Sequence, residues 1–146
     1  MQNDERPFIE YDMEKIYALK EEYELNLKFI KENLPPINWN SPKQIKALFM
    51  QALEISLKNV TISHVQSFMD RYDHDSAEFD LINGAVLYLK TKFTLNNYIN
   101  CIVKHNDSGR IYLRKERGAW LLPNKRPLST SPEIQQCEIR TTNSKE

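Results

Sequence analysis

The segment of this sequence best suited to hold a ligand is a polar helix start at residues 40–44. Ser41 is a good N-cap, a proline follows it at the first helical position, and Gln44 lies three residues after the cap, which together make a capping box. Backbone N–H groups at a helix start attract phosphate oxygens, and Asn40 and Lys43 place further donors beside them. The segment indicates an anion-binding helix start or, as for most capping boxes, a purely structural cap.

Other polar and basic side chains could contact phosphates in the same way. Lys58 and Thr61 lie in an expected loop, and Ser63 is expected to cap a short helix that follows it. The C-terminal part of the chain carries further cations: Arg110, Arg114, Lys115, Arg117, Lys125, Arg126 and Arg140. A solvated strand face is the alternative explanation of this basic run.

The charges are balanced overall but not along the chain. Twenty Lys and Arg residues oppose twenty Asp and Glu residues, so the formal net charge is zero. Residues 1–40 hold nine acidic and five basic side chains, whereas residues 105–146 hold five acidic and eight basic ones. A shift from acidic to basic along a chain can mark a nucleic-acid-binding face.

Two long amphipathic helices are expected to position these side chains. From Ile9 to Leu34 apolar residues recur with a heptad rhythm that Lys20 breaks once, and two prolines after Leu34 end the pattern. Between Phe79 and Val103 a second run has apolar residues three and four positions apart. Because the two apolar seams are complementary, we expect an antiparallel helix pair with short helices at its tip.

The C-terminal part is expected to contain little regular structure. Residues 110–113 and 119–122 are predicted to form two short strands with Gly118 between them. From Pro123 onward the chain is polar, contains further prolines and is expected to be irregular. The predicted fold class is therefore mainly α: two long antiparallel helices, a short helical tip, a small β ribbon and an irregular C-terminal segment.

The length of 146 residues suits one domain. We expect a single domain over residues 1–146, with a helical part at 7–104 and a strand-and-loop part at 105–146.

Several other kinds of protein find no support in the sequence. No apolar run approaches the roughly 20 residues that span a bilayer, and the polar, acidic N-terminus does not resemble a signal peptide. Cys101 and Cys137 form no CxxC motif, so a reduced, cytoplasmic protein is expected.

Residues 70–75 contain three Asp and one His, but their spacing fits no metal motif and indicates a hydrated loop. Ser129 and Ser131 lack the glycines of a nucleophile elbow. We expect no metal site, no hydrolytic site and no membrane contact.

Four segments resemble, in order, motifs of the family A, bacterial polymerase I-like DNA polymerases. Residues 38–49 resemble the NSPKQL…LF segment at the thumb tip, and residues 88–98 resemble part of the second long thumb helix. Residues 108–112 resemble the TGR(I/L)H strand that leads into the palm, and residues 128–140 resemble the LSSSDPNLQNIPIR segment. The spacing is close to that of the family and the matches cover nearly the whole chain, so the chain is similar to the thumb of that family.

The resemblance implies a module that grips duplex DNA by its phosphates without reading bases. The implied DNA-binding residues are Asn40, Ser41, Lys43, Lys58, Thr61, Ser63, Lys92, Asn96, Asn97, Arg126, Gln136 and Arg140. The metal-binding aspartates of the family's palm and the nucleotide-binding helix of its fingers would lie beyond Glu146. We therefore expect no catalytic residue and no cofactor in this chain, with Mg²⁺ only if a separate palm completes it. The expected partners are duplex or primer–template DNA and a separate palm–fingers chain, and the chain itself would be a cut domain, a split subunit or a remnant.

The chain also departs from the family, which leaves a second function open. Of the TGR motif that precedes the fourth segment, only the arginine has a counterpart, Arg126. Glu133 and Gln136 stand where the family has two asparagines. Phe93 stands where the family has a lysine, and Lys92 is next to it in the sequence. Together with the zero net charge, these changes fit a helical protein–protein interaction domain that keeps the thumb fold but has lost DNA binding. Salt-dependent duplex binding separates the two hypotheses.

Overall fold

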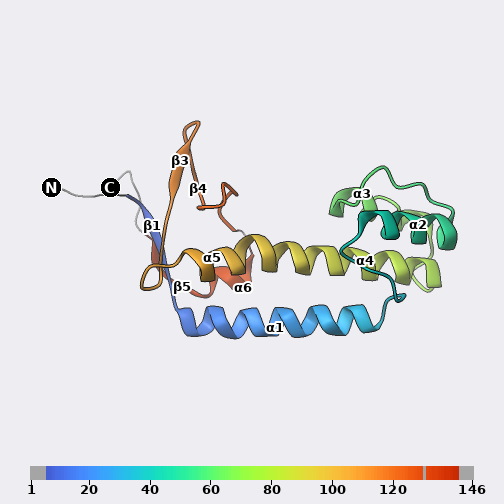
Figure 1. Cartoon of the computed structure of the whole chain (residues 1–146), viewed down its shortest axis with the longest axis horizontal. Helices are drawn as coiled ribbons and strands as arrows, with labels where there is room; N and C mark the ends of the chain where they lie inside the picture. The colour runs from blue at the N-terminus through green and yellow to red at the C-terminus, as the bar shows by residue number, and fades with distance from the viewer. Residues whose placement is uncertain (1–5, 130, 142–146) are drawn as a thin grey trace. The chain divides into compact units, whose positions relative to one another are not determined.

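The computed structural model describes residues 6–129 and 131–141 (Figure 1). In chain order its elements are β1 (Phe8–Tyr11), α1 (Met13–Glu32), α2 (Pro42–Leu53), α3 (Ile62–Gln66), the 3₁₀ helix η1 (Met69–Arg71), α4 (Ala77–Thr94), the π-helical segment η2 (Leu95–Ile99), α5 (Asn100–His105), β2 (Arg110–Tyr112), β3 (Arg114–Glu116), β4 (Ala119–Leu121), α6 (Pro132–Gln135) and β5 (Glu138–Thr141). The chain forms two compact units: unit 1 is Met1–Glu24 with Phe93–Glu146, and unit 2 is Leu25–Lys92.

The fold is mixed rather than mainly α. Helices account for just over half of the described residues, and the strands form two small antiparallel sheets. One sheet has the strand order β2-β1-β5, and the other is the β3–β4 hairpin. The prediction that helices dominate is confirmed, but the three-stranded sheet was not predicted, because the sequence of β1 favours a helix and that of β5 favours irregular structure.

The first long helix begins later than its apolar rhythm suggests. Residues Phe8–Tyr11 form β1, and α1 starts at Met13, where the Asp12 carboxylate accepts hydrogen bonds from the backbone N–H groups of Glu14 and Lys15 at 3.1 and 3.4 Å. Asp12 thus acts as the N-cap that the first turn requires. The prediction of a helix from Ile9 was wrong, because β1 is buried between β2 and β5, with Ile9 opposite both Ile111 and Thr141.

The second long helix continues as predicted but contains a π-helical segment. Helical structure runs without a break through α4, η2 and α5, which covers the expected continuation past Asn96 and Asn100. Leu95 and Ile99 of η2 are buried. The buried Oδ1 atom of Asn100, the residue after η2, has no hydrogen-bond partner among the described residues. Single π-turns of this kind have no recognisable sequence signature.

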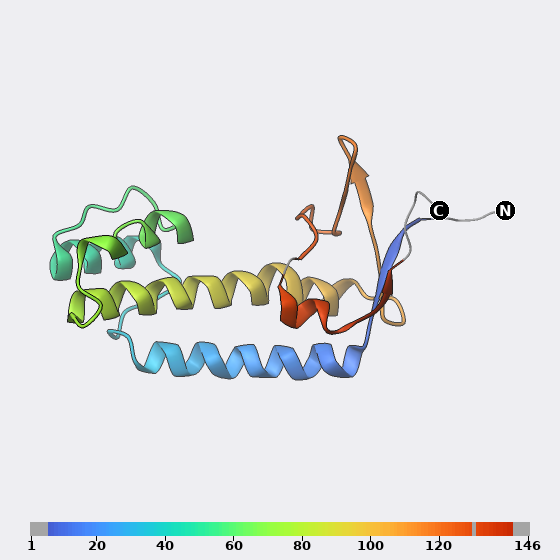
Figure 2. The same ribbon diagram turned by 180° about the vertical axis from the view of Figure 1, so that it is seen from behind.

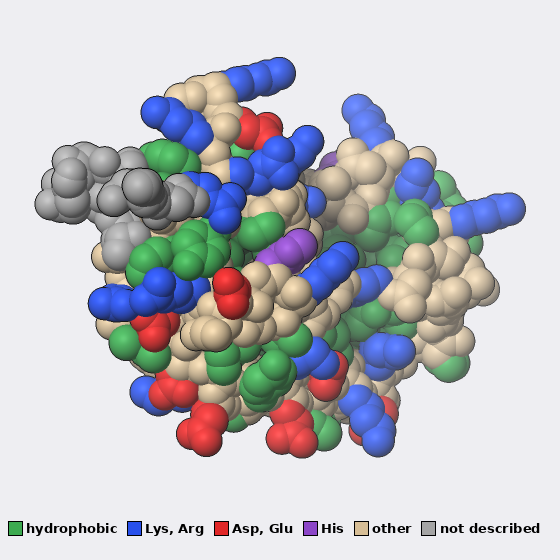
Figure 3. Space-filling view, turned by 60° about the vertical axis from the view of Figure 1, so that its left-hand side comes forward, with side chains coloured by type: hydrophobic (Ala, Val, Ile, Leu, Met, Phe, Trp, Pro, Cys, Tyr) green, Lys and Arg blue, Asp and Glu red, His purple; other side chains and the backbone are tan. Residues whose placement is uncertain are grey.

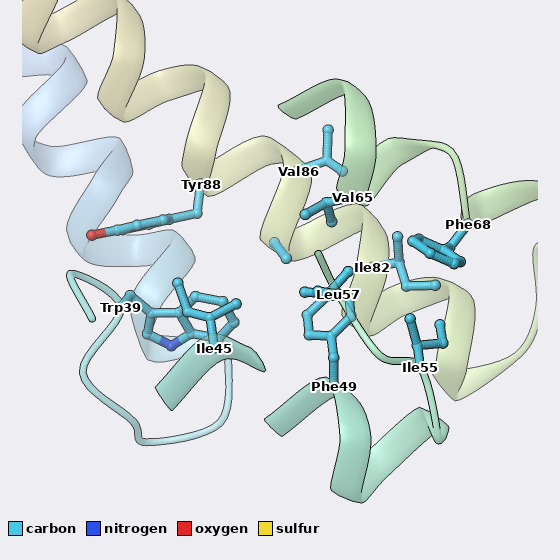
Figure 4. Close-up of a cluster of buried hydrophobic side chains, with 11 residues drawn as sticks. Trp39, Ile45, Phe49, Ile55, Leu57, Val65, Phe68, Ile82, Val86 and Tyr88 are labelled. Atoms are coloured by element: carbon cyan, nitrogen blue, oxygen red, sulfur yellow. The ribbon is translucent and has the colours of Figure 1, made fainter. Parts of the chain in front are cut away.

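Unit 2 has its own hydrophobic core (Figure 4). Its buried members are Trp39, Ile45, Phe49, Ile55, Leu57, Val65, Phe68, Ile82, Ala85, Val86 and Tyr88. Half-buried side chains at the C-terminal end of the first helical run, including Ile30 and Leu34, pack against this core. A Cβ atom at Gly84 would lie 2.8 Å from Leu34 Cδ2, so a glycine at this position lets that side chain approach α4 closely. The core therefore joins α4 to α2, α3 and the end of α1.

Unit 1 contains both sheets. The expected ribbon between residues 110–113 and 119–122 does not form as predicted: β2 pairs with β1, and the hairpin partner of β4 is β3. Figure 2 shows this hairpin, in orange, extending away from the helices of unit 1. Arg117 and Gly118 have φ values of 52° and 83°, which is the two-residue pattern of a type I′ hairpin turn.

The C-terminal segment is more regular than predicted. Pro132 begins the short helix α6, and the chain then returns to the sheet as β5. Ile134 and Cys137 are buried, and the backbone N–H of Asp12 donates to the carbonyl of Cys137 at 2.8 Å. The segment is therefore held against the start of α1, about 125 residues earlier in the chain, a distance over which a local sequence pattern carries no signal.

Candidate nucleic-acid interface

The start of α2 has the cap that the sequence predicts, in a modified form. The Ser41 hydroxyl accepts a hydrogen bond from the backbone N–H of Gln44 at 3.2 Å, and Pro42 occupies the first helical position. In a standard capping box the Gln44 side chain would accept from the N–H of Ser41. Here its Oε1 atom accepts from the N–H of Asn38 at 2.8 Å. The cap therefore fixes the conformation of the whole loop that precedes α2.

Asn40 and Lys92 meet beside this helix start. The Oδ1 atom of Asn40 accepts hydrogen bonds from the Lys92 ammonium group and from the Tyr88 hydroxyl, the latter at 3.4 Å. The Lys92 ammonium also lies 5.8 Å from the centre of the Tyr88 ring. These residues are 48 and 52 positions from Asn40, so the fold of unit 2 brings together two DNA-binding residues predicted from separate motifs.

Tyr88 is the part of this arrangement that was not predicted from the sequence as a functional residue. It is 3% exposed, and its ring lies 5.8 Å from the Trp39 ring, at the edge of the unit 2 core. Burial raises the pKa of the Tyr88 phenol, so the hydroxyl stays protonated and donates at neutral pH. Tyr88 belongs to one of the motifs that carry the family resemblance, which was the available signal.

The groups that remain for a ligand at this position are hydrogen-bond donors. With Oδ1 of Asn40 held by two donors, its side-chain NH₂ group is the part left to bind outward. The Ser41 hydroxyl uses an acceptor lone pair in the cap and keeps its proton to donate. Pro42 has no N–H, and within residues 6–129 and 131–141 the N–H of Lys43 has no acceptor. With the Lys43 and Lys92 ammonium groups, these donors suit a phosphate oxyanion. We call the four residues Asn40, Ser41, Lys43 and Lys92 the tip cluster.

The second predicted loop has a largely structural geometry. Thr61, and not Ser63, caps α3: its hydroxyl accepts from the N–H of His64 at 3.3 Å and donates to Asn59 Oδ1 at 2.8 Å. The prediction of Ser63 as the cap was wrong by two residues, because the Asn59 side chain closes the turn ahead of Thr61. The N–H of Lys58 donates to His64 Nε2 at 3.1 Å, and the side chains of Lys58 and Ser63 are exposed.

The remaining predicted contacts lie in unit 1 and are not gathered at one point. Asn96 and Asn97 sit in η2, where the Asn97 side chain donates to the Phe93 carbonyl at 3.0 Å and the Asn97 carbonyl accepts from the Asn124 side chain at 2.8 Å. The Arg126 guanidinium lies 5.2 Å from the centre of the Phe93 ring. Stacking on an aromatic ring is a common way to hold an exposed Arg.

Gln136 and Arg140 lie at the C-terminal end of unit 1. Gln136 is exposed and forms the C-cap of α6. The Nε atom of Arg140 lies 2.9 Å from Glu10 Oε1, and its guanidinium lies 5.6 Å from the centre of the Phe8 ring. Arg110 stacks on the same ring at 4.3 Å. The positive charge of Arg140 is therefore partly neutralised within the sheet.

The structure thus brings four of the twelve predicted contacts together in the tip cluster of unit 2. Lys58, Thr61 and Ser63 belong to the same unit, and the other five belong to unit 1. In the part of the chain that the structure describes, no group of three or more His, Cys, Asp or Glu side chains could hold a metal ion. No described helix is both long and apolar enough to cross a membrane.

Comparison with protein-family models, with curated proteins and with solved structures gives no match to this chain.

Proposed function

We propose that the chain is a module that binds duplex DNA, such as a primer–template, without sequence specificity, in the manner of the thumb of a family A DNA polymerase. In this proposal the two long helical runs are the antiparallel arms of the thumb, and α2 and α3 form its tip. The module has no catalysis of its own and works as a fragment, a split subunit or a remnant, with a separate palm–fingers chain as a further partner.

The observation that carries the proposal is the tip cluster. Asn40 and Lys92 belong to different motifs and are 52 positions apart in the sequence, but they meet at the start of α2. The groups of the tip cluster that remain available to a ligand are hydrogen-bond donors and cations. Phosphate contacts of this kind position a protein on DNA and carry no sequence information. The approach of Leu34 to Gly84 in unit 2 supports the antiparallel arms, because a residue just after the end of α1 then packs near the start of the second helical run.

Binding is expected to be weak and to depend strongly on salt. Non-specific complexes typically have dissociation constants of about 10⁻⁴–10⁻⁶ M, and each neutralised phosphate contributes about 0.9 to the slope of log K against log salt concentration. With Lys43 and Lys92 as the tip's cations, the tip should account for roughly two units of the slope.

The test is a fluorescence-anisotropy titration of a labelled primer–template duplex at several salt concentrations. Lys43→Ala combined with Lys92→Ala should flatten the slope by roughly two units. The matched control is Lys28→Ala combined with Lys31→Ala, which removes two exposed charges of the first helix and should leave the slope nearly unchanged. Equal slopes for the wild type and the Lys43/Lys92 variant would rule out the tip as the DNA contact.

One observation favours the alternative of a protein-interaction domain. Leu25 and Phe29 are one helical turn apart on α1 and are 62% and 67% exposed. Two large apolar side chains on one helix face are typical of a surface that binds another protein. If the chain shows no duplex binding at low salt, this second function becomes the better account.

A further inference from the structure

The β3–β4 hairpin of unit 1 carries positive charge that its own side chains do not neutralise. Its one carboxylate, Glu116, is paired with Arg114, with 2.7 Å between Glu116 Oε2 and Arg114 Nη2. Among the residues that the structure describes, neither Lys115 nor Arg117 has a carboxylate partner. Residues 117–132 contain no Asp or Glu. Figure 3 shows Lys and Arg side chains gathered around this hairpin at the top of the view.

Trp120 lies on the same face of the hairpin as Lys115. The two residues are directly opposite each other in the antiparallel register, so their side chains point to one side. Arg114 and Glu116, at the alternate positions of β3, belong to the opposite side. The Lys115 ammonium lies 5.5 Å from the centre of the Trp120 ring. A ring attracts a cation but does not neutralise its charge as a carboxylate would, so Lys115 keeps its charge for a ligand.

The two tryptophans of the chain have different surroundings. Trp39 is 3% exposed in the unit 2 core, and its indole N–H donates to the Pro35 carbonyl at 3.0 Å. Trp120 is partly exposed on a two-stranded hairpin, and its indole N–H has no acceptor among the described residues. A buried tryptophan usually pairs this donor. Trp120 therefore keeps both ring surface and a donor available to a ligand.

An aromatic ring with cations beside it is the combination that binds single-stranded nucleic acid. Proteins hold single strands by stacking bases on aromatic side chains and by placing cations along the phosphates. The bases of a duplex are stacked on one another, so a side chain reaches their faces mainly in an unpaired strand. An exposed cation–π contact is weak, so a base can take the ring of Trp120 while the Lys115 ammonium moves to a neighbouring phosphate. A cross-strand pair that only stabilises the hairpin is the alternative explanation.

We infer that the β3–β4 hairpin binds single-stranded nucleic acid, with a base stacked on Trp120 and phosphates held by Lys115 and Arg117. Arg117 is exposed at the hairpin turn. The inference rests on the proposed function: on a primer–template the ligand is the unpaired template strand, whereas the tip cluster contacts the duplex. Each phosphate neutralised on a single strand contributes about 0.7 to the salt slope, so these two cations should supply roughly 1.4 units.

Intrinsic fluorescence tests the stacking directly, because a base stacked on the ring quenches tryptophan emission. The full chain is titrated at low salt with an oligothymidylate of about eight nucleotides, a length that one single-strand module covers. Emission of the wild type should fall saturably. In Trp120→Phe the remaining emission comes from the buried Trp39 and should not change. The absence of saturable quenching in the wild type would overturn the stacked base, whatever the fold of any variant.

Anisotropy of the labelled oligothymidylate measures what each group contributes. Trp120→Val removes the ring but keeps a side chain suited to a strand, and it should weaken binding by roughly 5- to 150-fold. Trp120→Phe keeps a ring for stacking and should bind more nearly like the wild type. A phenylalanine variant as weak as the valine variant would contradict stacking. Lys115→Ala combined with Arg117→Ala should flatten the salt slope by roughly 1.4 units, and the Lys28/Lys31 control variant should not.

The outcomes separate this inference from the proposed function. A blunt duplex has no unpaired strand, so its binding should depend on the tip cluster and not on Trp120. Duplex binding that the Lys43/Lys92 variant weakens, without quenching by the oligothymidylate, would overturn the hairpin site and leave the tip cluster standing. Quenching and Trp120-dependent binding of the oligothymidylate without any duplex binding would overturn the proposed duplex grip and leave a single-strand site on the hairpin. The absence of both effects would overturn both.

Discussion

Replacing Val86 with Asp is the sharpest test of the unit 2 core that positions the tip cluster. Val86 is 4% exposed and belongs to the same buried cluster as Trp39 and Tyr88. Losing the buried Val side chain should cost about 1.5–3 kcal/mol, and a buried carboxylate without a partner should add about 3–5 kcal/mol. A typical domain has only about 5–15 kcal/mol of stability, so unit 2 should be unfolded or close to unfolded at neutral pH.

The fluorescence of Trp39 reports directly on this core. Trp39 is 3% exposed in the cluster, and the chain has only one other tryptophan, Trp120. A Trp120→Phe background therefore isolates the signal of unit 2 during guanidinium unfolding. The control is Leu87→Asp, the same new side chain one position along α4, where the native side chain is 49% exposed. It should cost less than about 1 kcal/mol.

The pH dependence identifies the buried charge as the cause. Burial should hold the pKa of the new carboxyl at position 86 above its unfolded value of about 3.9. The folded state then binds the proton more tightly than the unfolded state, so the loss of stability is smallest near pH 4 and grows as the pH rises. A Val86→Asp protein that unfolds at the same guanidinium concentration as the wild type at pH 7 would refute the assignment of Val86 to the core.

Three further predictions concern the cap, a phenol and catalysis. Ser41→Ala should lower the free energy of unfolding by about 1 kcal/mol and Ser41→Gly by only a few tenths, as measured by chemical unfolding. Burial, together with the hydrogen bond to Glu133, raises the pKa of Tyr23 to about 12. An ultraviolet titration should therefore show this phenol ionising near pH 12, and Glu133→Gln should lower the pKa of Tyr23. Because the folded pKa lies above the unfolded value of about 10, the stabilisation is complete below pH 10 and is lost between about pH 10 and 12, which unfolding curves at pH 9 and 11.5 can check. The purified chain should not extend a primed template with Mg²⁺ and nucleotides, because phosphoryl transfer needs carboxylates that hold the metal ions, and template-dependent extension would contradict this expectation.

The predictable parts of the fold are those that a short stretch of sequence determines by itself. The cap at Ser41 follows from residue types within four positions, and the structure confirms it. The apolar spacing of three and four after Phe79 likewise predicted a helical run to Val103, and the observed run ends two residues later, at His105. Local hydrogen bonding and helical periodicity determine both features, so the sequence alone carries them.

The parts that were missed depend on distant partners. Ile9 lies in a strand only because Ile111 and Thr141 supply its neighbours, more than 100 positions away. Within the sequence window around Ile9 the heptad rhythm favours a helix, and tertiary pairing overrides it. The contact of Asn40 with Lys92 was missed for the same reason, although each residue was expected to contact phosphate through its own motif.

The most direct test of the proposed function is a map of amide shifts on adding an unlabelled primer–template duplex at low salt. DNA binding at the tip cluster predicts saturable shifts of the Lys43 backbone N–H and of the Asn40 side-chain NH₂, which fade as salt is raised. It also predicts that the backbone amides of exposed residues of the first helix, such as Lys28 and Lys31, stay unperturbed. No shift at Lys43 and Asn40, or shifts confined to the first helix around Leu25 and Phe29, would contradict the tip as the DNA contact.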